Sequence, residues 1–499
     1  MSERLQTGNI GVDFEHAPAP ASNQVGPLIA SIVLAGALFL ATFTGFLVLP
    51  RSGLARAEVI AVIWMNIGLI LTAIVVEARR RPYSLHLMHL LALFLFVGAP
   101  ALFQYSTGRF GVAGPIVNVR RQVLLAALTV TIWLVSYLVG YELQHRYGGQ
   151  RRGPVLSFLD RPILPRRILA ILILALLVVL YLAVVGLAGV ATRGAAEADM
   201  LEFAEKSSAS GFTLMVYLIH QMLLRAFSLI ALLAALLSFA RDRQNRNPLI
   251  VLLLISVGIG TFFANNPFAA ARMWLATSII GFASLFLRRL RTGWALVVIA
   301  LSGITLLPSL HETRYLERLE DWWDYVALVS PLDYLAGNSD VDGLGMLALC
   351  QQWKELHGHR WGMQTAGSML FWYPRRFWIH KPVDTGMMVT EDLGFDFTNL
   401  APPVMSDYLV DFDFPGVLVF GALFGVLLAK VDRTYWNSHL DKARTRVIDA
   451  IYPFWIGCIL YFTRGGSMAS LSFTMAFTFW VLPLGIGGPR ASRTGDQHD

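Results

Sequence analysis

Charged side chains are scarce in this sequence. Asp, Glu, Lys and Arg make up 15% of its 499 residues, whereas 56% are hydrophobic. A soluble globular domain carries about 25% charged residues, so the composition indicates an integral membrane protein. The net charge of +7 does not point to a nucleic-acid partner. The arginines gather between apolar runs, as the positive-inside rule describes.

Cysteine is rare in the sequence, and the common catalytic motifs are absent. The two cysteines, Cys350 and Cys458, are too few for a disulfide framework or a thiolate metal site. The sequence contains no HExxH, P-loop, CxxC or GxSxG motif, and no dense cluster of aspartates that would hold a divalent metal near phosphates. We therefore expect a site without a metal or a cofactor. The polar segment before the first apolar run has more acidic than basic residues, so it does not form the basic n-region of a cleaved signal peptide.

Apolar runs occupy most of the chain. A membrane-spanning helix needs about 20 apolar residues, and this requirement predicts an all-α polytopic membrane protein with about 12 transmembrane helices. Spans 1–9 would lie within residues 26–309 and spans 10–12 within 415–486, with tails at 1–25 and 487–499. The candidate spans are about 26–49, 57–77, 83–104, 122–142, 167–191, 212–238, 247–264, 268–287, 293–309, 415–430, 447–463 and 468–486.

The charges of the links predict the orientation of the spans. Arginine-rich links alternate with links that have fewer bases, so we expect the basic links and both termini to be cytoplasmic. The residues Arg109, Arg120 and Arg121 fit this assignment least well. The one long loop, 310–414, then lies outside. Loops longer than about 15 residues without structure are uncommon, and apolar periodicity predicts short helices within this one. The basic links are 79–81, 146–167, 241–246, 288–291 and 430–446.

The external loop contains the stretch FWYPRRFWIHKPVDTG, residues 371–386, which concentrates cations and aromatic rings. Arginine matches phosphate oxygens with a planar fork and keeps its charge when partly desolvated. Arg375 and Arg376 are therefore candidate phosphate-binding residues. The alternative is an interfacial aromatic belt whose arginines reach the lipid headgroups. Further candidate ligand contacts in the stretch are Lys381, His380, Trp372 and Trp378.

Other arginines stand at or inside apolar spans. Arg272 and Arg464 are placed at external span ends, where a charge costs a few kcal/mol unless it is paired or wetted. One anion site shared with Arg375 and Arg376 explains them together. Arg225 is expected near the middle of a span, either as a ligand contact or in a structural pair with a carboxylate.

A reaction at such a site would need a base to deprotonate a hydroxyl nucleophile. The external loop offers acidic side chains and histidines for this role. The sequence does not rank them. The candidates are His311 and the acidic residues Asp384, Glu391, Asp392, Asp396, Asp407, Asp411 and Asp413. We take Asp384 and His311 as the catalytic candidates and Asp407 as a substrate-binding candidate.

The stretch 374–382, followed by Gly386, resembles the P-R-x-x-W-x-x-K-P…G pattern of bacterial O-antigen polymerases and related oligosaccharide repeat-unit polymerases (Wzy-type). The Asn266–Arg272 hairpin is similar to an N-P…R element of the same proteins. The run 401–416 looks like their return into the membrane, although they tend to have Glu and Gly where this chain has Asp407 and Phe414.

The resemblance implies a glycosyltransferase on the external face of a bacterial inner membrane. Its substrate would be a polyprenyl-pyrophosphate-linked oligosaccharide, and its product O-antigen, capsule or exopolysaccharide. The four arginines would stabilise the pyrophosphate leaving group, and an acidic residue or a histidine would act as base. Membrane lipid and a chain-length regulator would be partners.

Three other functions remain open from the sequence. An O-antigen ligase shares the architecture. A lipid-linked sugar flippase or another transporter should place its binding groups near the midplane in broken helices, whereas most cations here are external. An acyltransferase would need a His-Asp pair that no span offers.

Overall fold

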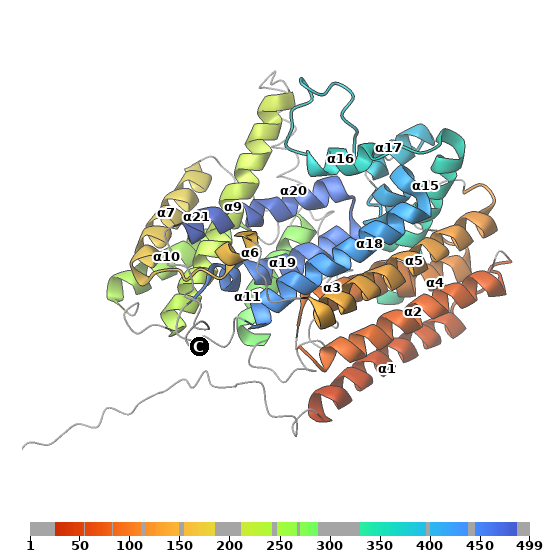
Figure 1. Ribbon diagram of the computed structural model, residues 1–499, viewed down its shortest axis with the longest axis horizontal. Coiled ribbons are helices and arrows are strands. Elements are labelled where there is room, and N and C mark those ends of the chain that lie inside the picture. The colour runs from red at the N-terminus through yellow and green to blue at the C-terminus, as the bar shows by residue number, and fades with distance from the viewer. Residues whose placement is uncertain are drawn as a thin grey trace, which may run out of the picture.

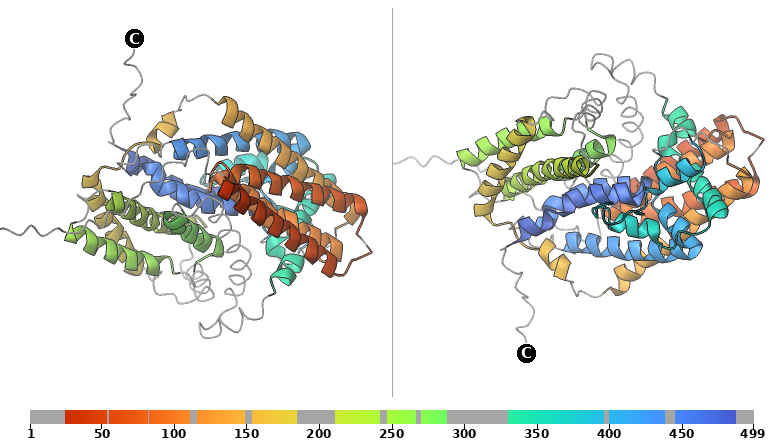
Figure 2. Two further views of the ribbon diagram at one scale, coloured as in Figure 1. Left: turned by 90° about the horizontal axis from the view of Figure 1, so that it is seen from below. Right: turned by 90° about the horizontal axis from the view of Figure 1, so that it is seen from above.

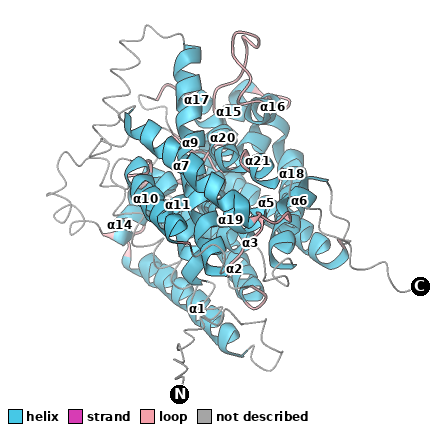
Figure 3. Ribbon diagram, turned by 90° about the vertical axis from the view of Figure 1, so that its left-hand side faces the viewer, coloured by secondary structure: helices cyan, strands magenta, loops and turns pink. Residues whose placement is uncertain are grey.

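The structure, a computed structural model, describes residues 25–53, 55–81, 83–110, 116–148, 154–184, 211–241, 247–266, 270–287, 330–395, 400–437 and 445–486. These residues form helices joined by turns and loops (Figures 1 and 3), and their only β-type contact is an isolated antiparallel bridge between Pro162 and Arg446. The expected all-α polytopic fold is confirmed.

Within the described residues, nine helices are long and apolar enough to cross a membrane, and two shorter apolar helices accompany them. These eleven correspond to eleven of the twelve expected spans. The remaining one, 293–309, lies outside the described residues, so the total of twelve stays a prediction. The nine are Leu28–Val48, Ala57–Ala78, Leu85–Thr107, Val119–Tyr147, Arg167–Val184, Met222–Arg241, Met405–Trp436, Val447–Arg464 and Ser467–Gly485; the two are Pro248–Ala264 and Arg272–Phe286.

The third span is the centre of the fold and is buried along its whole length. Helix α3 (Leu85–Leu93) runs into a single π-helical turn, η2 (Phe94–Gly98), and continues as α4 (Ala99–Thr107). A helix that is apolar on all sides is expected to be surrounded by other helices. Pro100 in the first turn of α4 cannot donate a backbone hydrogen bond. Such local breaks in a helix often occur at functional sites.

Helices α5 (Val119–Tyr147) and α18 (Met405–Asn437) pack backbone to backbone against each other, and α18 also contacts α3. A Cβ atom on Gly140 would collide with the carbonyl of Ala422, and one on Gly425 would collide with the carbonyl of Tyr137. Gly421 and Gly425 have the small-xxx-small spacing that lets membrane helices approach closely.

Helix α18 is kinked where the sequence predicted the change from loop to span. Asp413 has φ 58° and ψ −157°, and Pro415 follows it. This conformation is strained for a residue with a side chain. Lys354 Nζ binds Asp413 Oδ1 at 2.5 Å. The helix itself begins earlier than expected, at Met405, so residues 405–412 form a short helix ahead of the span.

The other helices flank this core (Figure 2). Helices α1 (Val25–Val48) and α2 (Ala57–Ala78) lie on one side, and α7, α9 and α10 pack together on the other. Helix α19 packs against α11, α20 and α9 between them. Two short helices, α6 and α21, complete the set. The bounds of the helices not yet given are α6 Pro154–Leu159, α7 Pro165–Val184, α9 Gly211–Arg241, α10 Pro248–Ala264, α11 Arg272–Leu287, α19 Val447–Arg464, α20 Ser467–Thr478 and α21 Val481–Gly485.

Ion pairs show which links share one end of the bundle. Arg80 pairs with Glu142 at 3.0 Å, Arg241 with Asp449 at 2.7 Å and Arg446 with Asp160 at 3.5 Å. These pairs join the ends of α2, α5, α6, α9 and α19. Basic links that the charge pattern assigned to one side of the membrane therefore lie together.

Arg120 and Arg121, which fitted that assignment least well, lie at the opposite end. Arg120 pairs with Glu58 at 2.6 Å and Arg121 with Glu355 at 2.9 Å. Their charges are balanced by these carboxylates, so they need not oppose the proposed orientation. Which end faces the cytoplasm stays a prediction.

The described part of the long loop folds into the short helices that were expected. They are α14 (Pro331–Gly337), the 3-10 turn η5 (Ser339–Val341), α15 (Gly343–His357), α16 (Met363–Met369) and α17 (Thr385–Asp392). Asp342 caps α15 by accepting a hydrogen bond from Gly345 N at 2.8 Å, as is typical of an N-cap. Residues Gly343–Trp353 are all buried, because α15 packs against α5 and α18.

Candidate active site

Two arginines from separate span ends meet at one carboxylate. Arg272 begins α11, Arg464 ends α19, and both bind Asp340 in the η5 turn. Arg464 Nη2 lies 2.6 Å from Asp340 Oδ1, and its Nε donates to the Asp340 backbone carbonyl at 2.6 Å. Arg272 Nη1 binds Asp340 Oδ2. The three side chains are only 13–17% exposed.

The surroundings of this cluster favour a further negative charge. Two guanidinium groups and one carboxylate leave one excess positive charge. Arg464 also lies over the Phe96 ring of the π-helical turn, 5.8 Å from its centroid, an arrangement that favours a cation. Burial and the nearby Asp340 raise the pKa of Tyr334, so its phenol stays protonated and remains a hydrogen-bond donor.

A carboxylate lies against the turn that follows Arg464. Asp384 caps α17, with Oδ1 accepting from Gly386 N at 3.1 Å. A Cβ atom on Gly466 would collide with Asp384 Oδ2, so only glycine leaves room for the carboxyl group there. That Oδ2 atom is buried.

Burial raises the pKa of Asp384, and backbone hydrogen bonds from Gly386 and Ala469 offset part of the rise. A carboxyl group with a raised pKa is suited to take up and return a proton near neutral pH.

A second carboxylate, Asp407, ties three elements together behind Asp384. Its Oδ1 accepts from Thr385 Oγ1 at 2.5 Å and its Oδ2 from Ser368 Oγ at 3.3 Å. Asp407 is 2% exposed. These contacts hold α16 and α17 on α18, which makes Asp407 a positioning residue for the loop that carries Asp384.

The side chains of Arg375 and Lys381 fold back on the backbone of their own loop. Arg375 Nη1 and Nη2 donate to the carbonyls of Lys381 and Pro382 at 2.7 and 3.1 Å. Lys381 Nζ donates to the carbonyls of Phe371 and Tyr373 at 2.5 and 2.9 Å. Burial, and to a smaller extent Arg375, lowers the pKa of Lys381.

The expected site of four arginines therefore takes a different form. Asp340 joins Arg272 and Arg464, whereas Arg375 holds its own loop. The Arg376 guanidinium lies over the Phe377 ring at 4.4 Å. The physical reason is that carbonyls near in sequence compete for the guanidinium of Arg375.

A basic pocket opens beside this loop, with a volume of about 440 Å³. It brings His380 and Lys381, two residues expected at the site, next to His359 and Arg360, which sequence reasoning did not select. Arg360 Nε is buried without a hydrogen-bond partner. Lys381 leads through two residues to Asp384, so the pocket and the carboxylate lie along one short segment. The lining residues are His359, Arg360, Met363, His380, Lys381 and Pro382.

The other expected site residues lie away from this cluster or outside the described residues. Trp372 is 55% exposed and Trp378 is half-buried. Arg225 is half-buried on α9, between Leu223, whose carbonyl accepts from Trp480 Nε1, and Ser228, which binds Asn265. Its role stays a prediction. His311 lies outside the described residues.

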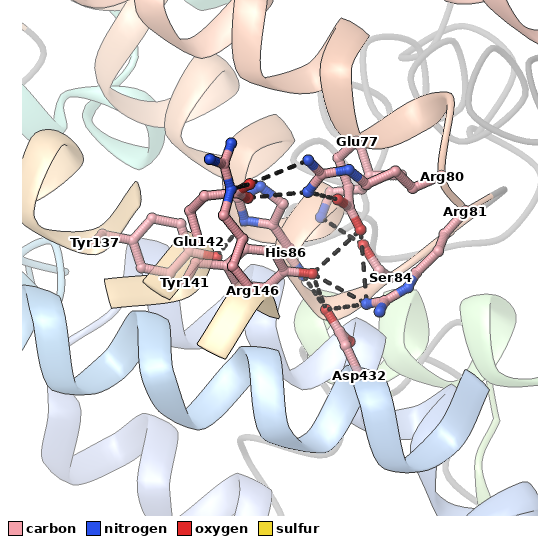
Figure 4. A network of polar contacts seen from close by, with 11 residues as sticks. Glu77, Arg80, Arg81, Ser84, His86, Tyr137, Tyr141, Glu142, Arg146 and Asp432 are labelled. Atoms are coloured by element: carbon pink, nitrogen blue, oxygen red, sulfur yellow. Dashed lines mark hydrogen bonds and ion pairs between the residues drawn. The ribbon is translucent and has the colours of Figure 1, made fainter. Parts of the chain in front are cut away.

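Sequence reasoning missed a buried charge network at the opposite end of the bundle (Figure 4). Asp432 accepts from Leu85 N at 2.9 Å, from Tyr141 OH at 3.1 Å and from Tyr452 OH at 2.6 Å, and Arg81 Nη1 lies 3.7 Å away. Glu77 accepts from Tyr141 OH at 3.2 Å. An acid inside an apolar run was the available signal. Together with Arg80, Arg146 and Glu142, which belong to the same network, three arginines face three carboxylates. The formal charges therefore balance, which indicates a structural role.

A scan against family models found no match, and searches of curated proteins and of solved structures found none either.

Proposed function

We propose that the protein is a polymerase of polyprenyl-pyrophosphate-linked oligosaccharide repeat units. One observation carries the proposal. Arg272 and Arg464, from two separate span ends, converge at Asp340, and the buried carboxyl group of Asp384 lies against the turn that follows Arg464. Paired cations would stabilise a pyrophosphate leaving group, and a buried carboxylate would serve as the base for a hydroxyl nucleophile.

In the proposed reaction, Asp384 takes the proton from an acceptor hydroxyl of the next lipid-linked unit. The hydroxyl oxygen bonds to the reducing-end carbon of the growing glycan as the bond from that carbon to the pyrophosphate oxygen breaks. The pyrophosphate leaves with the bonding electrons, and Arg272 and Arg464 stabilise its charge. This stabilisation is stronger in a partly buried site than in water. Asp384 then releases the proton to solvent.

Asp340 holds the two guanidinium groups at fixed positions, and the loop around Arg375 and Lys381 connects the basic pocket to Asp384. The pocket would receive part of the acceptor glycan. Arg375 thus supports the site by shaping its loop. The product would be O-antigen, capsule or exopolysaccharide, made on the external face of the inner membrane.

Deletion followed by glycan profiling tests the proposal. If the protein is the polymerase, the deletion strain should carry lipid that is capped with single repeat units and no polymer. A lipid-linked polymer accumulating outside would instead identify a ligase. Repeat units trapped on the inner face would identify a flippase, and either result would overturn the proposal.

A further inference from the structure

Residues 369–379 expose large apolar side chains although they lie outside the membrane-spanning segments. Met369 is 61% exposed, Trp372 55%, Phe377 61% and Ile379 79%. We call residues 369–379 the apolar finger. It directly follows α16, which packs against α18 and α20. A Cβ atom on Gly367 of α16 would touch Met468 at the start of α20. The apolar finger therefore begins where a span ends.

The backbone of the apolar finger is hydrogen-bonded internally, although it is not a regular helix. Lys381 Nζ satisfies the carbonyls of Phe371 and Tyr373. Turn hydrogen bonds satisfy the carbonyls of Leu370, Pro374, Arg375 and Trp378, with N···O distances of 2.9–3.1 Å. Irregular backbone tolerates an apolar environment only when its polar groups find partners within the protein. Six of the eleven carbonyls of the finger accept from these groups, so much of its backbone can enter the boundary between headgroups and acyl chains.

The charged residue at the tip suits a headgroup layer. Arg376 is exposed and its guanidinium stacks on Phe377, so its charge stands next to an apolar side chain. Long cationic side chains reach headgroups in this way while their stems stay in apolar surroundings. Tryptophan, here Trp372, is enriched at the same depth. The basic pocket adjoins the finger through Lys381, and its charge complements phosphate.

We propose that the apolar finger inserts into the outer leaflet of the membrane that the protein spans, with Arg376 at the level of the headgroup phosphates. The partner is the phospholipid surface. The inference goes beyond the proposed function and does not depend on it. It fixes the loop that carries Asp384 at the membrane surface.

Nitroxide labels in full-length protein reconstituted into phosphatidylcholine–phosphatidylglycerol vesicles test this. The native Cys350 and Cys458 are buried. Any labelling of these two cysteines is measured in the parent protein, which carries no added cysteine. A label on Ile379→Cys should collide more with oxygen than with a water-soluble nickel complex. A label on Glu391→Cys, at an exposed position on α17, should show the reverse. Nickel accessibility at 379 equal to that at 391 would overturn the proposal. Protection of 379 from both reagents would indicate a protein contact and would also overturn it.

A second experiment tests the anchor side chains. With the label on Met369→Cys, the change Phe377→Ser plus Ile379→Ser should raise nickel accessibility several-fold in protein that still elutes as a folded species. Leu356→Ser replaces another exposed apolar residue, 66% exposed on α15, and should leave the label unchanged. An unchanged label in the double variant would show that the finger is not anchored by these residues.

Discussion

At the scale of residues, the central feature is a carboxylate shared by two arginines. A buried ion pair contributes little to stability by itself, but losing one partner leaves an uncompensated charge. Asp340 with Arg272 and Arg464 is therefore better explained as a preorganised cation site than as a stabilising bridge. The arrangement leads to two predictions.

Replacing Arg464 by Gln should lower polymerisation by about 10²–10³-fold, the usual effect of removing one charge-stabilising donor. Arg464→Lys should recover part of the rate, because it restores charge without the planar fork. The measurement is glycan chain growth by the purified protein in vesicles. Arg121→Gln is the matched control, since it breaks a solvent-exposed pair with Glu355 that is worth about 0–1 kcal/mol. An equal loss in both variants would show that the effect is not specific to the cluster.

The pH dependence should follow Asp384. Its pKa is raised by burial, so the carboxyl group stays protonated at higher pH than in an unfolded chain. Activity should rise as the pH passes upward through that raised pKa. The sign for stability is opposite. Folding favours the neutral acid, so the contribution of Asp384 to stability is present below its unfolded pKa and is lost as the pH rises through the folded one.

Rate–pH profiles and unfolding midpoints of the parent and of Asp384→Asn check both statements. The variant should lose most activity. Its stability should no longer fall as the pH rises through the raised pKa of Asp384. An Asp384→Asn protein with parental rates and an unchanged acid limb would exclude Asp384 as the base.

At the scale of elements, close helix packing decides where the site stands. The glycines of α5 and α18 bring the two backbones into contact. The kink at Asp413 then directs residues 405–412 toward α16 and α17. The sequence shows the glycines, but which helix they face depends on the fold.

Gly140→Ala should destabilise the protein by about 1–3 kcal/mol, because the added methyl group has to displace backbone at the carbonyl of Ala422. Thermal unfolding in detergent is the measurement. Gly68→Ala on α2 is the control, since a Cβ atom there meets nothing within 4 Å. It should be neutral or stabilising by up to about 1 kcal/mol. Equal midpoints for the two variants would contradict the packing argument.

At the scale of the whole molecule, the ion pairs show which links lie at the same end of the bundle. The charge pattern predicts which of the two ends is external. A cysteine at Asp333, exposed on α14, should react with an impermeant reagent in intact spheroplasts. A cysteine at Tyr147, which is 78% exposed at the end of α5, should react only after permeabilisation. The reverse pattern would invert the topology and remove the proposed function from the external face.

The sequence by itself determined the membrane class, the nine helices long enough to cross a membrane, the two shorter apolar helices and the helical character of the described part of the loop. Length, apolar content and charge between runs are local properties, so one sequence displays them. It also placed Arg272 and Arg464 at span ends and included Asp384 among several bases.

Only the tertiary structure decided which groups meet. Nothing local marks Asp340 as the partner of two arginines, or shows that Gly466 makes room for Asp384. Likewise, the sequence could not show that Arg375 would bind the carbonyls of its own loop. A hydrogen bond requires two groups to come within about 3 Å at a suitable angle, and for residues far apart in the chain the packing of the helices sets that distance.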